Sequence, residues 1–131
     1  MTFSKPRFNK KYEYELVRFC SKLNYHVIGA AGKLLKYFEK TYQPKSIVSY
    51  ADRRWSIGNL YEKIGFTLVY KSKPNYWYFK NLKLENRLKF QKHKLKNILE
   101  KFDENLSEYE NMKSNGYNRI YDCGNLVYIK F

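Results

Sequence analysis

The sequence predicts an α/β (α+β) fold: a mixed sheet with flanking helices, followed by a C-terminal helical and hairpin extension. Two observations predict it. Short runs of aromatic and β-branched residues alternate with runs of helical periodicity through residue 80. The 131 residues, 44% hydrophobic and 19% aromatic, suffice for one buried core and exclude a disordered basic tail. We therefore expect a single domain over 1–131, with its core at 12–80 and the extension at 81–131.

The first part of the chain predicts two strands and a helix. Residues 1–4 form a short β-prone fragment. Residues 12–20 (YEYELVRFC) carry apolar side chains on both faces, as a central strand requires. Residues 33–40 place three apolar side chains on one helical face, and Pro44 ends that helix.

Three strands and a helix follow. Residues 46–51 (SIVSYA) predict a short buried strand. Residues 55–64 have apolar side chains at helical spacing, and Gly65 stops the helix. Strands at 66–70 and 76–79 flank a Lys-Pro-Asn turn.

The last third has a different pattern. Residues 84–102 predict a long basic helix whose leucine-rich stripe would pack on the sheet. Ser107 and Glu110 fit a capping box that begins a short helix. The segments 117–121 and 126–131 predict a hairpin.

The formal charge of +14 is unevenly distributed. Residues 71–101 carry +8, whereas residues 102–131 carry −2. Such a positive field attracts polyanions, chiefly nucleic acid. The alternative is a solvated surface that serves solubility. No run approaches the ~18 apolar residues of a membrane span, and the start of the chain lacks a signal peptide's apolar stretch. We therefore expect a cytoplasmic protein without a membrane partner.

The metal-binding residue types are sparse. The cysteines Cys20 and Cys123 lie far apart, and their spacing to the histidines His26 and His93 does not fit a zinc motif, so no metal site is predicted. We expect both thiols to be buried and outside disulfides.

Basic segments supply candidate nucleic-acid contacts. Arg53 and Arg54 precede Trp55 at a strand-to-helix turn, where guanidinium groups can hold phosphates and the indole can stack. The alternative places Trp55 in the core and pairs the arginines with Asp52 and Glu62. The predicted basic helix can lie along a phosphate backbone; its alternative is a solvated helix without a partner. The candidate contacts are Arg53, Arg54, Lys71, Lys73, Arg87, Lys89, Lys92, Lys94 and Lys96.

A turn of small residues, from Gly29 to Gly32, opens the predicted helix at 33–40. Backbone amides at a helix start lie at the positive end of the helix dipole and can hold a phosphate or another anion. The alternative is that these small residues only allow the helix to pack closely on a strand.

Two motifs in this region carry a family resemblance. Residues 26–35 (HVIGAAGKLL) resemble the acyl-CoA pyrophosphate loop of the GNAT superfamily of acetyltransferases, and residues 60–66 (LYEKIGF) resemble its second signature. The strand between them lies where that superfamily has its splayed strand. The resemblance implies a GNAT-like fold that is truncated at the front.

The same resemblance implies roles for individual residues if the chain is an N-acetyltransferase. Acetyl-CoA would then be the cofactor, Tyr61 the general acid and Glu15 or Glu13 the base. Otherwise no cofactor is implied. The cofactor-binding positions would be His26, Ile28, Gly29, Ala30, Ala31, Gly32 and Lys33.

A second resemblance covers nearly the whole chain, which is similar to the C-terminal region of phage homing-endonuclease-like proteins. The segments that carry it are 14–20 (YELVRFC), 33–38 (KLLKYF), 49–56 (SYADRRWS), 74–78 (PNYWY), 90–95 (FQKHKL) and 120–124 (IYDCG). It implies a DNA-binding accessory module in a phage-infected bacterial host, with DNA favoured over RNA as the partner. Proteins of this kind often carry a separate nuclease domain upstream.

Nuclease chemistry within the chain is not expected, because its carboxylates are few and scattered. A front-truncated fold leaves a sheet edge exposed, which favours pairing of two copies. A third alternative is a phage protein that binds a host protein and uses its charge to speed association.

Overall fold

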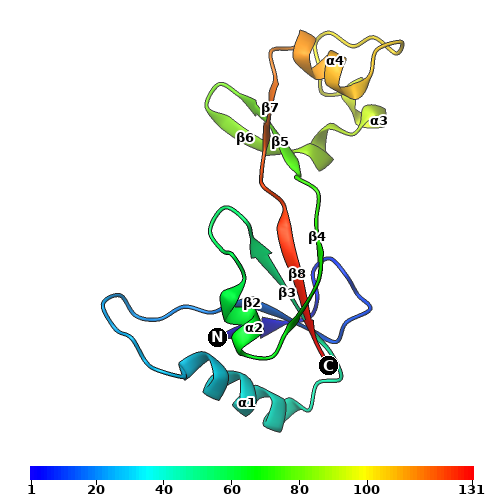
Figure 1. Cartoon of the computed structure of the whole chain (residues 1–131). Coiled ribbons are helices and arrows are strands. Elements are labelled where there is room, and N and C mark those ends of the chain that lie inside the picture. Colours follow the sequence, from blue (N-terminus) through cyan, green and yellow to red (C-terminus); the bar gives the residue numbers. More distant parts are fainter. The chain divides into compact units, whose positions relative to one another are not determined.

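Figure 1 shows the computed structural model, which describes residues 1–131. The chain is a mixed α/β protein with two sheets and four α-helices, in agreement with the predicted α+β class. Its contacts divide it into two compact units. Unit 1 comprises Met1–Lys73 and Gly124–Phe131, and unit 2 comprises Pro74–Cys123. None of the helices is long and apolar enough to cross a membrane.

Unit 1 is built on a five-stranded sheet of order β1-β2-β3-β8-β4. Its strands are β1 (Thr2–Ser4), β2 (Tyr14–Arg18), β3 (Ile47–Asp52), β4 (Thr67–Lys71) and β8 (Asn125–Lys130). Only β2 and β3 pair in parallel; the other pairs are antiparallel. Helix α1 (Ala30–Tyr42) connects the two parallel strands, and α2 (Asn59–Lys63) precedes β4.

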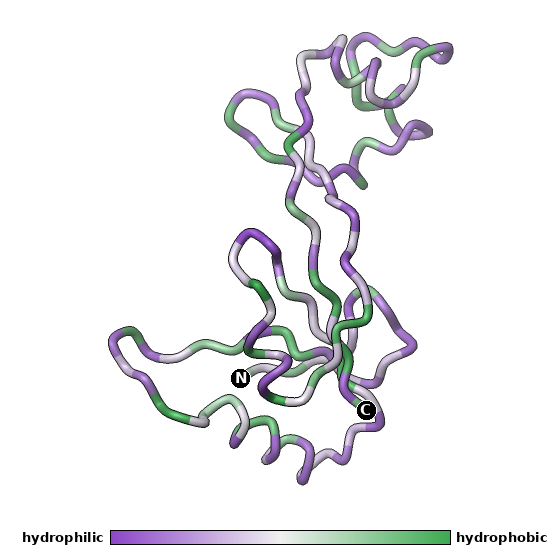
Figure 2. Tube along the Cα trace, in the orientation of Figure 1, coloured by the Kyte–Doolittle hydropathy of each residue, from purple (hydrophilic) through white to green (hydrophobic).

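The two faces of this sheet bury separate apolar clusters. On one face, Leu35 and Phe38 of α1 share a cluster with Leu16 of β2. On the other face, Val48 of β3 clusters with Tyr12, which lies in the segment before β2. Hydrophobic and hydrophilic residues alternate along α1 in Figure 2, as expected of a helix with one face on a sheet.

Unit 2 has a smaller sheet of order β6-β5-β7, formed by β5 (Tyr76–Lys80), β6 (Lys83–Asn86) and β7 (Asn118–Tyr121). A 3-10 helix η1 (Arg87–Phe90) and the helices α3 (Lys92–Leu95) and α4 (Glu108–Ser114) complete it. Tyr78, Phe90 and Leu95 are fully buried in its own core. The predicted capping box begins α4: Ser107 accepts from the amide of Glu110, whose carboxylate accepts from the amide of Ser107.

The prediction of one long basic helix at 84–102 is wrong. Asn81 and Leu82 both adopt positive φ, 49° and 60°, and turn the chain so that β6 pairs with β5. Leu84 and Leu88 are exposed, so the leucine stripe forms no continuous face. Strand pairing with β5 therefore overrides the helical periodicity, and the basic residues lie on a strand, a 3-10 turn and a four-residue helix.

The prediction of a hairpin between 117–121 and 126–131 is also wrong. Strand β7 pairs with β5 in unit 2, whereas β8 lies between β3 and β4 in unit 1. Gly124, with φ 73°, begins the return to unit 1, and a Cβ there would lie 2.4 Å from the carbonyl oxygen of Ser72. A glycine at this position therefore allows the backbone to pass close to Ser72 just before β8 joins the larger sheet.

Candidate functional site

Four of the predicted nucleic-acid contacts meet at one end of the unit 1 sheet. Strand β3 ends opposite the start of β8, and β4 ends on the other side of the same strand. The Arg53 amide donates to the carbonyl of Gly124 at 3.1 Å, and the Ser72 amide donates to the carbonyl of Asn125 at 2.8 Å. The side chains brought to this end form what we call the sheet-end cluster: Arg53, Arg54, Trp55, Lys71 and Lys73.

Trp55 stands out in this cluster because 85% of its side chain is exposed. It lies in a turn in which the amides of Trp55 and Ser56 both donate to the carbonyl of Asp52, at 3.0 and 2.9 Å. The alternative of a core tryptophan is therefore excluded, and the predicted helix at 55–64 shortens to α2. An exposed indole among cations is a surface suited to stacking on a nucleobase.

The arginine beside Trp55 is held in place by a carboxylate. Arg54 donates from Nε to both oxygens of Asp52, at 3.1 and 3.0 Å, and its Nη2 lies 2.5 Å from Oδ2. These hydrogen bonds lower the pKa of Asp52. The pair keeps Arg54 in one orientation while half of its side chain stays exposed. Arg53, Lys71 and Lys73 are exposed residues of the same cluster.

The remaining predicted contacts all lie in unit 2 and are exposed, but they do not form one row of cations. Lys89 pairs with Glu85 at 2.6 Å and Lys96 with Glu104 at 3.7 Å. Lys92 and Lys94 reach backbone carbonyls of Glu104 and Leu88, and Arg87 lies 5.2 Å from the ring centroid of Tyr76.

The small residues predicted as a turn at 29–32 line a cavity of about 470 Å³ in unit 1, and all of them except Gly29 lie within α1. Gly29, with φ 72°, precedes α1; no side chain caps the helix, and its first turn has no acidic residue. The amides of Ala31 and Gly32 donate to no backbone acceptor, and the space beside Gly29 and Gly32 is open. Leu60, Lys63 and Ile64 line the same cavity, so the structure brings the segments 26–35 and 60–66 together.

Two predicted cofactor positions differ in their surroundings. Ile28 is 94% exposed at the edge of this cavity, whereas Lys33 lines a neighbouring cavity of about 450 Å³ with Phe19, Cys20 and Tyr25. His26 and Ala30 line the first cavity. Most of the predicted cofactor loop thus surrounds one space next to the start of α1.

The candidate acid and base of an acetyltransferase are not brought together. Tyr61 stacks on Tyr128 at 4.8 Å, on the sheet face that carries α1. Glu15 pairs across the sheet with Val48, which belongs to the cluster of the opposite face. Glu15 is 1% exposed and accepts three hydrogen bonds from Arg7, which makes it a structural carboxylate.

Glu13, the other candidate base, accepts from the amide of Lys45 at 2.7 Å and so anchors the chain before β3. No three His, Cys, Asp or Glu side chains gather as metal ligands would. Cys20 and Cys123 form no disulfide; the expectation that they are buried is wrong, because both lie in exposed loops.

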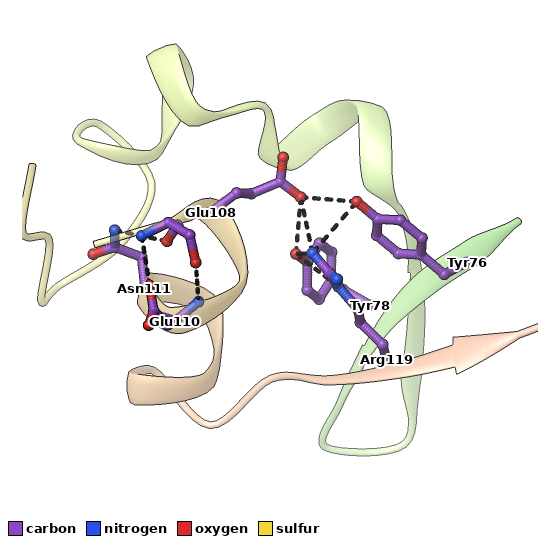
Figure 3. A network of polar contacts seen from close by, with 7 residues as sticks. Tyr76, Tyr78, Glu108, Glu110, Asn111 and Arg119 are labelled. Carbon is purple, nitrogen blue, oxygen red and sulfur yellow. Dashed lines mark hydrogen bonds and ion pairs between the residues drawn. The ribbon is translucent and has the colours of Figure 1, made fainter. Parts of the chain in front are cut away.

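Unit 2 contains a polar network that sequence reasoning did not identify (Figure 3). Tyr76 and Tyr78 donate from their hydroxyls to Oε1 of Glu108, at 3.1 and 2.8 Å. Arg119 of β7 donates to the Tyr78 hydroxyl at 3.0 Å and lies 3.7 Å from Oε1 of Glu108. Burial raises the pKa of Tyr78 above its ordinary value. The one available signal was the tyrosine pair two positions apart, which shares a strand face.

Comparison with models of protein families, with curated proteins and with solved structures finds no match for this chain. We therefore infer the function from the geometry and chemistry of the chain's own side chains.

Proposed function

We propose that this chain is a DNA-binding accessory module that contacts phosphates through its basic surface, in the manner implied by its resemblance to phage homing-endonuclease-like proteins. The observation that carries the proposal is the sheet-end cluster, in which an exposed Trp55 lies among four basic residues. Phosphate contacts position a protein on DNA, and an aromatic ring adds stacking that tolerates any base.

The charge of unit 1 supports this proposal. It carries 16 Lys and Arg residues against five Asp and Glu residues. Neutralising DNA phosphates releases counterions, so such a unit gains affinity from each cation that reaches the backbone. Asp52, the carboxylate within the cluster, is held by Arg54, so its charge opposes phosphate less than that of an unpaired carboxylate. The module needs no cleavage chemistry of its own if a separate nuclease domain lies upstream, as the resemblance implies.

The test measures binding of the full chain to duplex DNA by fluorescence anisotropy over a series of salt concentrations. A variant with Arg53→Gln, Lys71→Gln and Lys73→Gln should lose affinity several-fold. Its slope of log K against log salt should flatten by about two to three, since each phosphate contact contributes about 0.9.

The matched control removes three exposed cations from the other end of the same unit: Lys36→Gln, Lys40→Gln and Lys45→Gln. Both variants lose the same charge, so a specific cluster predicts a larger effect for the first. Equal losses would show that net charge alone drives binding, and no binding by the parent chain would end the proposal.

A GNAT-like fold of unit 1, truncated at the front, is part of the proposal. It is supported by the parallel pair β2 and β3, by the connection through α1, and by the cavity that both motifs line. That cavity also favours a second function, acetyl-CoA binding, because free amides at the start of a 13-residue helix suit a pyrophosphate. Tyr61 would then be the proton donor, and the base would have to come from a residue other than Glu15.

Isothermal titration with acetyl-CoA tests this second function. Gly32→Glu should abolish any heat of binding, because it places a carboxylate beside the free amides, where a Cβ meets no neighbour. Lys36→Glu, on an exposed position of the same helix, is the control. No heat with the parent chain at millimolar cofactor would remove acetyl-CoA binding from consideration.

A further inference from the structure

A cavity of about 190 Å³ in unit 2 is lined by Tyr76, Arg87, Leu88, Gln91 and Glu108. We propose that it holds one unpaired base of a DNA strand, and that it selects bases whose exocyclic amino group donates to Glu108. This inference rests on the proposed DNA-binding function and adds to it a base preference that the charge pattern does not contain.

Glu108 has one carboxylate oxygen committed and one available. Oε1 accepts from Tyr76 and Tyr78 and faces Arg119. Oε2 receives no hydrogen bond from the protein, and in Figure 3 it points away from the two tyrosines. A carboxylate held by three groups on one oxygen keeps its second oxygen in a defined place, as a recognition group requires.

The rings around this carboxylate reinforce the arrangement. The guanidinium of Arg119 lies 4.2 Å from the ring centroid of Tyr76 and 4.4 Å from that of Tyr109, so it makes cation–π contacts with two aromatic rings. The Arg87 guanidinium lies 5.2 Å from the ring centroid of Tyr76. The cavity is therefore bordered by a planar cation that can stack on a base or pair with its phosphate.

The charges and the size of the cavity define its ligand. Glu108 disfavours a free anion, while Arg87 and Arg119 disfavour a free amine, so a neutral donor next to a phosphate suits the site best. Pockets for drug-sized ligands usually exceed ~300 Å³, so this one suits a single ring. Gln91 offers an amide that can donate and accept at the base edge.

The carboxylate of Glu108, which accepts hydrogen bonds, determines which base the cavity prefers. A carboxylate oxygen accepts from the N4 amino group of cytosine, as Asp and Glu do in direct base readout. Thymine presents a carbonyl oxygen at the equivalent position and would leave Glu108 facing another acceptor. We therefore expect a strand with cytidine to bind more tightly than one with thymidine.

The experiment compares a short single-stranded thymidine oligonucleotide with the same oligonucleotide carrying one central cytidine, at neutral pH and constant salt. The full chain should prefer the cytidine strand by up to about tenfold. Glu108→Gln should remove the preference while retaining most of the general affinity. Glu104→Gln removes the same charge from a 77% exposed site in the same unit and should retain the preference.

The thermal transition of each variant shows whether it is folded. Gln91→Ala changes no hydrogen bond of the network, and it should reduce the preference for the cytidine strand, which tests the base site a second time. Equal affinity of the parent chain for both strands, or a preference that survives in folded Glu108→Gln, would overturn the base site and leave DNA binding intact. Failure to bind either strand or duplex DNA would overturn both proposals.

Discussion

Replacing Arg7 by methionine should destabilise unit 1, because it leaves the carboxylate of Glu15 charged, buried and short of partners. Arg7 donates from Nε and Nη2 to Oε1 of Glu15, at 3.0 and 2.6 Å, and both bonds would be lost. Its backbone amide still donates to Oε2 at 2.8 Å. Removing one partner of a buried ion pair costs about 3–5 kcal/mol.

The lower end of that range applies here, since 56% of the Arg7 side chain is exposed and one hydrogen bond remains. A loss of about 3 kcal/mol in the free energy of unfolding should lower the thermal midpoint by roughly 10 °C in a chain of this size. Urea unfolding followed by circular dichroism measures the free energy, and a thermal scan measures the midpoint.

Two variants make the reasoning refutable. Arg54→Met breaks an ion pair of similar geometry with Asp52, but at an exposed site, and should cost about 0–1 kcal/mol. Arg7→Met combined with Glu15→Met removes both charges and should be less destabilised than Arg7→Met alone. If Arg7→Met costs no more than Arg54→Met, burial of Glu15 does not control the energy and its structural role is refuted.

Four further outcomes follow from the geometry. Gly58→Ala should lower the free energy of unfolding by about 2–4 kcal/mol, because φ is +91° and the new Cβ would lie 1.8 Å from the Tyr128 hydroxyl. Urea unfolding measures this loss, and a change under about 1 kcal/mol would contradict the prediction. Burial raises the pKa of Tyr78, so its contribution to stability is present below pH ~10 and is lost as pH rises above that value. Between pH ~9 and ~11, the free energy of unfolding should therefore fall less in Tyr78→Phe than in the parent chain. Ser107→Ala should cost about 1 kcal/mol in the same assay by removing the cap of α4, and an unchanged transition would argue against the capping box. Reversing the charge of three exposed lysines in unit 2 should weaken DNA binding several-fold and flatten its salt slope, whereas unchanged affinity would confine the phosphate contacts to unit 1. Those lysines are Lys89, Lys92 and Lys96.

Elements with a clear local pattern could be predicted from the chain alone. The two-faced apolar run at 12–20 contains β2, and the single apolar face at 33–40 lies within α1. The capping box at Ser107 can be predicted from the sequence because it depends on a few neighbouring residues. The turn predicted at 29–32 is wrong for Ala30 to Gly32, which form the first turn of α1. The sequence also predicts the cations of the sheet-end cluster as contacts, but it does not indicate that they meet at one end of the sheet.

What the residue pattern established about this protein is its α+β class, its basic character, the presence of α1 and the capped start of α4. Tertiary structure alone decided that residues 84–102 are not one helix, that β8 pairs with β3 and β4, and that Glu15 binds Arg7. Periodicity and capping act between residues a few positions apart, whereas strand pairing and buried ion pairs join segments distant in sequence. Their energies depend on which partner is in reach, and that appears only in the folded chain.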